Sequence, residues 1–355
     1  MLSCHVNRKD LIKALDVTRK VIDRSKQLPI LSNVLLQHDG YALTLTCSDL
    51  ESYCSRTLAV DGDAGQTTVG CKTLTDVLKR FSDDSLTLQD RGREGVQVVG
   101  ERATITVKNL PADEYPTVMM GDRPELGRVA YGASLRDALQ RTLQSVYPDD
   151  PYNSKVLQGV LFEAAGNVLT LVGCNTHTCS VAEVPYLGAD FRQIVPTRVA
   201  RLLAGVLSDG CDIGYSDGWL TFATAAGTDV VRCQAIDGEF PRWQRIVPAS
   251  FDHEVQLQGL DLRESLKIVS GVDIKVQIDF SPGRVTLTAK DIELGEARAV
   301  IEADVDFEDH VRVDGQRLMS GLFDDGEVTL CCNGPRKPIM VRGGYNFVLA
   351  ALEMK

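Results

Sequence analysis

One short hairpin pattern occurs three times in this chain, at a spacing close to the length of a small domain. The copies are HDGYALTLTCSDLE (His38–Glu51), AAGNVLTLVGCNTH (Ala164–His177) and SPGRVTLTAKDIE (Ser281–Glu293). Each contains a turn glycine (Gly40, Gly166 and Gly283) followed by alternating apolar and polar residues, the pattern of a β-strand that leaves a hairpin turn. A repeat of this length indicates tandem copies of one domain and not a solenoid.

Helical patterns flank each hairpin. Apolar residues spaced by three, four and seven positions predict one amphipathic helix before each hairpin and one after it. The expected helices cover Asn7–Ile22, Cys71–Phe81, Ser134–Leu143, Val195–Ala204, Leu260–Val269 and Val313–Phe323, with Pro196 in a first helical turn. A second pair of strands follows each second helix: SLTLQ and ATITV, CDIGY and TDVVRC, EVTLCC and PIMVRG. Each third of the chain therefore predicts an α+β domain with two helices on one face of a mostly antiparallel sheet.

The boundaries between the thirds are marked by related phrases. LPADEYP (Leu110–Pro116) and AIDGEFP (Ala235–Pro241) both place an acidic residue, an aromatic residue and a proline in an exit turn. We therefore expect three domains, at residues 1–122, 123–248 and 249–355. A chain of 355 residues has room for three domains of about 100–150 residues each.

The composition is that of a soluble globular protein, with 44% hydrophobic and 25% charged residues. The start, MLSCHVNRKD, has no apolar core of signal-peptide length, and no run approaches the roughly 20 apolar residues of a membrane span. We expect a cytoplasmic protein without a membrane partner. Its ten cysteines are then expected to be reduced, several of them as small core residues.

Basic residues are concentrated in the helical segments. Segments 7–26, 71–81, 134–143, 195–204, 260–270 and 313–323 carry 17 Lys and Arg against 8 Asp and Glu, whereas the whole chain has a net charge of −11. Helix propensity favours Glu about as much as Lys and gives no sign bias, although chance segregation stays open as an alternative. A basic face shared by the helices suits a polyanion, and the absence of a base-reading motif favours contact with phosphates regardless of sequence.

Three similar domains, six helices and a basic inner face suggest half of a ring around duplex DNA. A closed ring of that bore needs about twelve helices of about 10 Å diameter. A head-to-tail pair of chains supplies them and closes with two-fold symmetry.

Ordered motifs along the whole chain resemble one family. They are LPILSNVLL (Leu28–Leu36), SDLES (Ser48–Ser52), TTVGCKTL (Thr67–Leu74), LPADEYP, LQGVLFE (Leu157–Glu163), IVPTRV (Ile194–Val199) and DGEFPRWQRIVP (Asp237–Pro248). In their order and spacing they resemble the bacterial DNA polymerase III beta subunit, the sliding clamp.

The resemblance implies a function without catalysis and without a cofactor. It implies three clamp domains in tandem, a ring-shaped homodimer on double-stranded DNA, and a nucleoid-associated location. The implied partners are the DNA polymerase III catalytic subunit, the ATP-driven clamp loader complex and other proteins with clamp-binding motifs. Consistently, the sequence has no G-x-x-x-x-G-K-[ST] or H-E-x-x-H motif.

The DNA-facing residues come from two sources. The resemblance implies Arg24, Lys26, Lys72, Tyr152 and Lys155. The charge of the helices adds Lys79, Arg80, Arg136, Arg141, Arg198, Arg201 and Lys267. A solvated helix face is the alternative explanation for each single residue.

The resemblance also implies a hydrophobic pocket for short peptide tails of partner proteins. By position it maps to Leu157, Cys174, His177, Pro241, Arg245, Ile246, Val348, Ala350 and Leu352. Two stretches depart from the family. Its Asp-Gly-His-Arg-Leu is replaced by Asn175-Thr176-His177-Thr178-Cys179, and its Met-Pro-Met-Arg-Leu ending by Ala350-Ala351-Leu352-Glu353-Met354. The third domain is also short between its first helix and the strand KVQIDF, so the chain resembles a divergent clamp with an altered pocket.

For the dimer, the family pairs an edge strand of the first domain with the third domain of the other chain. Ile105 and Val107 match the first side, and Ile268 and Val269 the second. The alternative is that all four are ordinary core residues.

Three rival interpretations remain. Cys174, His177 and Cys179 could bind zinc or serve as nucleophile and base of a thiol or metal enzyme, although a fourth ligand is not evident. A clamp-like scaffold that does not encircle DNA is a second. An acidic DNA mimic is a third, which the basic helices oppose.

Overall fold

The computed structural model describes residues 1–22, 28–116, 125–147, 154–207, 209–323 and 325–352, and one order of elements recurs in it three times. The first repeat contains β1 (Ser3–Asn7), α1 (Arg8–Thr18), β2 (Asn33–His38), β3 (Ala42–Ser48), β4 (Ser52–Ala59), β5 (Gly62–Asp63), β6 (Gly65–Gly70), α2 (Cys71–Leu78), β7 (Ser85–Asp90), β8 (Val96–Val99), β9 (Thr104–Val107) and β10 (Asn109–Leu110).

The other two repeats follow the same order. The second contains β11 (Glu125–Val129), α3 (Gly132–Thr142), β12 (Gly159–Ala165), β13 (Val168–Cys174), β14 (Thr178–Pro185), β15 (Leu187–Gly188), β16 (Phe191–Pro196), α4 (Thr197–Val206), β17 (Cys211–Ser216), β18 (Trp219–Thr224) and β19 (Asp229–Gln234). The third contains β20 (His253–Gln258), α5 (Gly259–Val269), β21 (Lys275–Ser281), β22 (Arg284–Asp291), β23 (Gly295–Glu302), β24 (Asp309–Asp314), α6 (Gly315–Ser320), β25 (Glu327–Cys332), β26 (Ile339–Arg342) and β27 (Asn346–Leu349).

All six predicted helices are present, with shifted ends. Pro196 was wrongly placed in a helix: it ends strand β16, opposite Gly159, and α4 begins one residue later. The prediction also missed a strand before each first helix (β1, β11 and β20), and it gave two strands after α2 where three are formed (β7, β8 and β9). Five-residue strands such as β1 are too short for their alternation to stand out from the helical pattern that follows.

The turn after the repeated hairpin strand is held by the same side-chain contact in all three repeats. It joins β3 to β4, β13 to β14 and β22 to β23. The side-chain Oδ1 of Asp49, Asn175 or Asp291 accepts hydrogen bonds from the backbone N–H groups two and three residues later, at 2.7 to 3.1 Å. Asp and Asn favour such turns because their short side chains reach the backbone. The repeat seen in the sequence is thus a repeat of structure.

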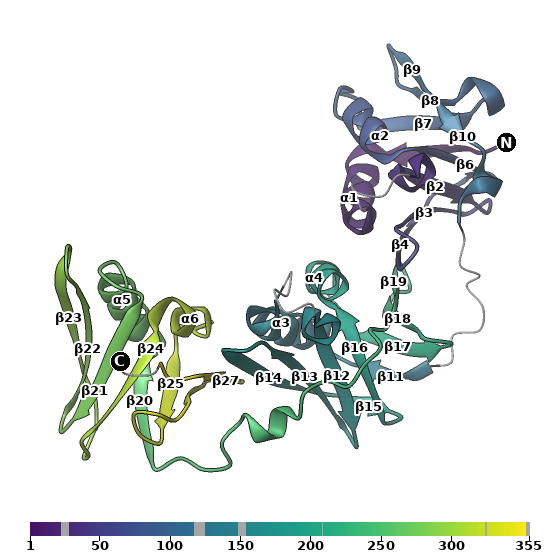
Figure 1. Ribbon diagram of the computed structural model, residues 1–355. Coiled ribbons are helices and arrows are strands. Elements are labelled where there is room, and N and C mark those ends of the chain that lie inside the picture. The colour runs from purple at the N-terminus through teal and green to yellow at the C-terminus, as the bar shows by residue number, and fades with distance from the viewer. Residues whose placement is uncertain (23–27, 117–124, 148–153, 208, 324, 353–355) are drawn as a thin grey trace. The chain divides into compact units, whose positions relative to one another are not determined.

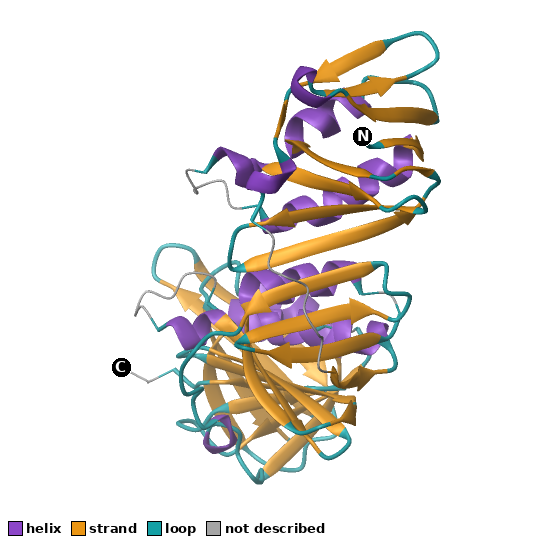
Figure 2. Ribbon diagram, turned by 90° about the vertical axis from the view of Figure 1, so that its right-hand side faces the viewer, coloured by secondary structure: helices purple, strands orange, loops and turns teal. Residues whose placement is uncertain are grey.

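Two compact units divide the chain. The first comprises Met1–Arg136, Pro185–Asp190 and Arg198–Ala235, and the second comprises Asp137–Val184, Phe191–Thr197 and Ile236–Lys355. In each unit more of the described residues lie in strands than in helices (Figure 2), and every described strand pair with a recorded register is antiparallel. No helix in the described part of the chain is long and apolar enough to cross a membrane.

The first unit holds two sheets. Their strand orders are β5-β1-β7-β8-β9 and β10-β6-β2-β3-β4-β19-β18-β17-β11-β15. Helix α1 contacts β1 of the smaller sheet and β3 and β4 of the larger one (Figure 1). Leu11 and Leu15 of this helix are fully buried, so the predicted apolar face is the face that packs.

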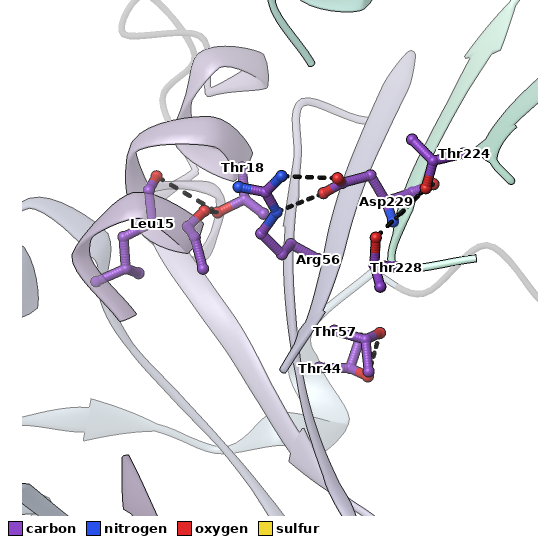
Figure 3. Close-up of polar contacts among 9 residues, drawn as sticks. Leu15, Thr18, Thr44, Arg56, Thr57, Thr224, Thr228 and Asp229 are labelled. Carbon is purple, nitrogen blue, oxygen red and sulfur yellow. Dashed lines mark hydrogen bonds and ion pairs between the residues drawn. The ribbon is translucent and has the colours of Figure 1, made fainter. Parts of the chain in front are cut away.

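An ion pair fixes the joint between β4 and β19 in the larger sheet. Arg56 opposes Asp229 in the strand register, and its Nε and Nη2 donate to the two carboxylate oxygens at 2.6 and 2.7 Å (Figure 3). The Asp229 backbone N–H donates to Thr224 Oγ1 at 3.1 Å. A two-pronged guanidinium–carboxylate contact is among the stronger polar contacts, so it holds together strands that lie 173 residues apart.

The second unit also holds two sheets, in the orders β16-β12-β13-β14-β27-β26-β25-β20 and β23-β22-β21-β24. Helix α5 packs on β22 and β23, and α6 contacts α5 and β24. The last strand, β27, joins β14 with Cys179 opposite Val348. Residues near the chain end thereby lie beside residues from the middle of the sequence.

Candidate functional site

A cavity of about 570 Å³ lies in the second unit, above a buried apolar cluster. Its described lining is Leu157, Cys174, Asn175, Thr176, His177, Thr178, Cys179, Pro241, Ile246, Arg336, Pro338, Val348, Ala350 and Ala351. The cluster includes Leu161, Val172 and Phe240. A concave apolar surface with a few polar groups at its rim is typical of a ligand or peptide site.

Three segments hold the cavity walls. The turn after β13 is fixed by the Asn175 side chain and by a bond from Asn175 N–H to the Thr178 carbonyl at 2.9 Å. The chain end is fixed beside it, because the Ala350 N–H donates to the His177 carbonyl at 2.9 Å. The third segment contains Pro241 and follows β19.

Seven of the nine pocket residues expected from the sequence line this cavity. The exceptions are Arg245, which is exposed, and Leu352, whose N–H donates to the Arg312 carbonyl at 2.7 Å. The sequence analysis missed Arg336 and Pro338, which lie in the turn before β26. The sequence could have indicated these two residues, because they directly precede β26, the strand that pairs with β27.

The polar side chains among the described lining residues are one guanidinium, one amide, one imidazole and two hydroxyls, with no carboxylate (Arg336, Asn175, His177, Thr176 and Thr178). Partial burial lowers the pKa of the His177 imidazole, and the nearby positive charge of Arg317 lowers it further. His177 is therefore neutral at pH 7. Tyr147 Oη and Thr176 Oγ1 share a hydrogen bond of 2.9 Å that holds the turn from outside.

The predicted DNA-facing residues fall into two classes. Lys72, Lys79, Arg80, Lys155, Arg201 and Lys267 are exposed and make no ion pair within the described residues. Arg198 differs, because its guanidinium contacts the Asp49 carboxylate at 2.7 Å and the Lys20 carbonyl at 3.3 Å. The first class is available to an external anion, whereas Arg198 is engaged inside the first unit.

Arg136 and Arg141 are half-buried. The Arg141 guanidinium lies over the Tyr345 ring, 5.1 Å from its centre. Arg24, Lys26 and Tyr152 lie outside the described residues.

The residues expected at a dimer contact also differ in how exposed they are. Strand β9, with half-buried Ile105 and buried Val107, is an edge of the smaller sheet of the first unit. On α5, Ile268 is 64% exposed. Val269 is fully buried in the core of the second unit, so its side chain offers no surface to another chain.

All ten cysteines are buried free thiols. Among the residues that the structure describes, no three His, Cys, Asp or Glu side chains are grouped so that they could hold a metal ion.

In sequence, the chain matches known proteins of one kind. Residues 2–119 match the family model for the DNA polymerase III beta subunit, N-terminal domain. The beta sliding clamp of Pseudomonas aeruginosa is 29% identical over 314 residues, covering 84% of this chain and 83% of that protein. The beta sliding clamp of Vibrio cholerae is 27% identical over 317 residues, covering 85% and 84%.

Solved structures match the fold across the chain. A P. aeruginosa sliding clamp bound to griselimycin has a TM-score of 0.91 at 22% identity, covering 99% of this chain and 100% of that one. The Helicobacter pylori beta clamp bound to a DNA ligase peptide has a TM-score of 0.89 at 17% identity, covering 99% and 100%. Residues 2–119 thus match the N-terminal domain of the DNA polymerase III beta subunit, most of the chain is similar in sequence to beta sliding clamps, and the whole chain has their fold.

Proposed function

We propose that this protein is the processivity factor of a bacterial replicative polymerase. Two copies would close head to tail into a ring that encircles duplex DNA and tethers partners through the cavity in the second unit. The observation that carries this proposal is the assembly of seven expected residues, from widely separated segments, into one cavity. The family relationship and the clamp fold support it.

Two sheet edges support the dimer. Strand β9 is an edge of one sheet in the first unit and β23 is an edge of one sheet in the second. Exposed apolar side chains gather near β23, including Ile268 on α5 and Ile292 and Leu294 in the turn before the strand. An edge strand leaves backbone groups open to pairing, and such a patch favours burial. We propose that β9 of one subunit pairs with β23 of the next.

Six exposed cations without ion pairs in the described chain support contact with DNA: Lys72, Lys79, Arg80, Lys155, Arg201 and Lys267. Five of them lie on or directly after helices α2, α4 and α5. Phosphate contacts of this kind carry no base information. We therefore propose binding that does not depend on DNA sequence.

The cavity is proposed to take an extended peptide with a leucine or aromatic anchor. A related clamp is described in complex with a DNA ligase peptide. The DNA polymerase III catalytic subunit, the clamp loader and other DNA-processing proteins are the proposed partners, and the proposed place of action is the nucleoid. The chain itself is proposed to be non-catalytic.

Retention on circular DNA tests the proposal. The labelled protein would be loaded on a nicked plasmid with the P. aeruginosa clamp loader and separated from free protein by gel filtration. We expect it to elute with the circular DNA and to be released when a restriction enzyme linearises the plasmid. The P. aeruginosa clamp serves as positive control.

Two results would contradict encirclement. Equal retention on circular and linear DNA would indicate ordinary surface binding. Failure to load, together with intact peptide binding, would favour the scaffold that does not encircle DNA.

A further inference from the structure

We propose that Cys174 and Cys179 form an oxidisable thiol pair in the cavity, and that joining them as a disulfide weakens the binding of partner peptides. The regulatory half rests on the proposed function, since it assigns a control to the same cavity. The chemical half depends only on the two side chains.

The turn after β13 sets the two cysteines opposite each other. The Asn175 N–H donates to the Thr178 carbonyl, so the next pair outward in this antiparallel hairpin is Cys174 with Cys179. Hydrogen-bonded and non-hydrogen-bonded pairs alternate, which puts the cysteines at a non-hydrogen-bonded position with Cα atoms about 4.5 Å apart. Disulfides span Cα separations of about 4.4–6.8 Å. The backbone therefore already has the spacing that a bond needs.

The side chains meet on the same face of the hairpin. Both belong to the apolar cluster under the cavity and both line the cavity. The Cys174 thiol donates a hydrogen bond to the Asn175 carbonyl at 3.6 Å, and the neighbouring Cys179 thiol lowers the pKa of the Cys174 thiol even though burial opposes the shift. Cys174 is thus the better nucleophile of the pair.

Other cysteines lack this combination. Burial raises the pKa of Cys211 and of Cys233 to about 12. Cys71 has a lowered pKa because the Cys47 thiol donates to it, but neither is among the lining residues of the cavity. Reactivity and access coincide at Cys174.

The chemistry needs a peroxide as oxidant. The Cys174 thiolate attacks one oxygen of hydrogen peroxide, the O–O bond breaks, and a sulfenic acid and hydroxide form. The Cys179 sulfur then attacks the sulfenic sulfur and loses its proton. The S–O bond breaks and water leaves as the S–S bond forms. A thiol reductant reverses the reaction by disulfide exchange.

The disulfide changes the cavity floor. In the thiol state the two sulfurs present soft apolar surface to the cavity beside Val348. Bonding draws them to about 2.05 Å and turns both side chains toward each other. The peptide anchor then loses van der Waals contacts, because even a small gap between atoms weakens this attraction strongly.

The test combines mass mapping with peptide binding. The whole protein is treated with hydrogen peroxide, blocked with iodoacetamide and digested with trypsin. Cys174 and Cys179 are the only cysteines of peptide 156–192, so a disulfide leaves this peptide unalkylated and two hydrogens lighter. Cys47 and Cys54 share peptide 27–56 and report on a cysteine pair away from the cavity. The probe is the DNA ligase peptide that is bound in the H. pylori clamp structure, labelled with fluorescein. Its fluorescence anisotropy measures binding before and after oxidation.

We expect peptide 156–192 to become lighter and peptide affinity to fall about tenfold, the loss of one central contact, with recovery in dithiothreitol. In Cys179→Ser, which keeps Cys174, oxidation should give no disulfide in peptide 156–192. The disulfide-dependent fall in peptide affinity should therefore be absent. In Cys54→Ala the wild-type response should persist.

Several outcomes would overturn the proposal. An unchanged mass of peptide 156–192 after oxidation overturns the chemical half. A formed disulfide with unchanged or stronger peptide binding overturns the regulatory half alone. If the reduced protein binds no peptide while the disulfide forms, the proposed function of the cavity fails and the thiol pair stands.

Discussion

The β3–β4 turn and the β13–β14 turn share one side-chain contact to the backbone and have different surroundings. In the first, the Asp49 carboxylate holds its own turn and also contacts Arg198, with the Asp49 side chain only 6% exposed. In the second, Asn175 makes the same turn without a charge, and the turn borders a cavity. One copy of the repeat therefore joins parts of the first unit, and the other is open to a ligand.

The difference shows that copies of one repeated turn can take on different roles. The side-chain oxygen at this position is needed by the fold, because it caps two backbone N–H groups in every repeat. The charge is not needed by the turn. Where a carboxylate is present in the first repeat it recruits an arginine, and where an amide is present in the second the neighbouring surface stays free of that ion pair.

The largest effect is expected from Asp49→Ala, which removes both tasks at once. It leaves two turn N–H groups without their acceptor and removes the carboxylate that pairs with Arg198, and we expect the free energy of unfolding of the first unit to fall by about 3 kcal/mol. Asp49→Asn copies the second repeat, keeps the turn and should lose about half as much. Urea denaturation measures both. A loss below about 0.5 kcal/mol for Asp49→Ala, the size of an ordinary surface substitution, would contradict the account.

Leu157→Ala tests the open side of the comparison. The side chain lines the cavity, and we expect affinity for the labelled ligase peptide to fall about tenfold, as for a contact near the centre of an interface. Leu187→Ala removes a leucine that is 65% exposed on β15 in the first unit and should leave affinity unchanged. Equal affinities for the two variants would place the peptide elsewhere.

Two arginines on α4 sharpen the comparison at the DNA surface. Arg201 is exposed without an ion pair in the described chain, whereas Arg198 is paired with Asp49. Arg201→Ala should reduce the slope of log affinity for duplex DNA against log salt by about 0.9, one phosphate contact. Arg198→Ala should mainly lower stability. Measured salt titrations that give the reverse assignment would contradict this division.

The smallest effect concerns the charge of the open turn. The pKa of His177 is lowered by burial and by Arg317, so NMR titration of its ring should give a midpoint below the 6.5 of an unperturbed histidine. The unfolded chain then takes up this proton more readily, and the stability contributed by His177 is lost as the pH falls below 6.5. A midpoint at or above 6.5 would contradict the effects assigned to partial desolvation and to Arg317.

The sequence carried the fold further than the site. Periodic leucines such as Leu11 and Leu15 located the helices because one buried face imposes that spacing. The cavity was predicted from the family resemblance, and its lining residues were predicted from local motifs. The pairing of Arg198 with Asp49 could not be predicted, because the two residues are 149 positions apart and meet only through tertiary packing. Arg336 was missed although it lies just before β26, the strand that pairs with β27.

The ring is the central claim, and the mass of the protein in solution tests it most directly. Light scattering over a concentration series should give a mass near twice the 38.8 kDa of one chain, and Ile105→Glu on the β9 edge should lower it. A stable mass of one chain at micromolar concentration would contradict a constitutive ring. It would mean that β9 and β23 do not pair between free subunits.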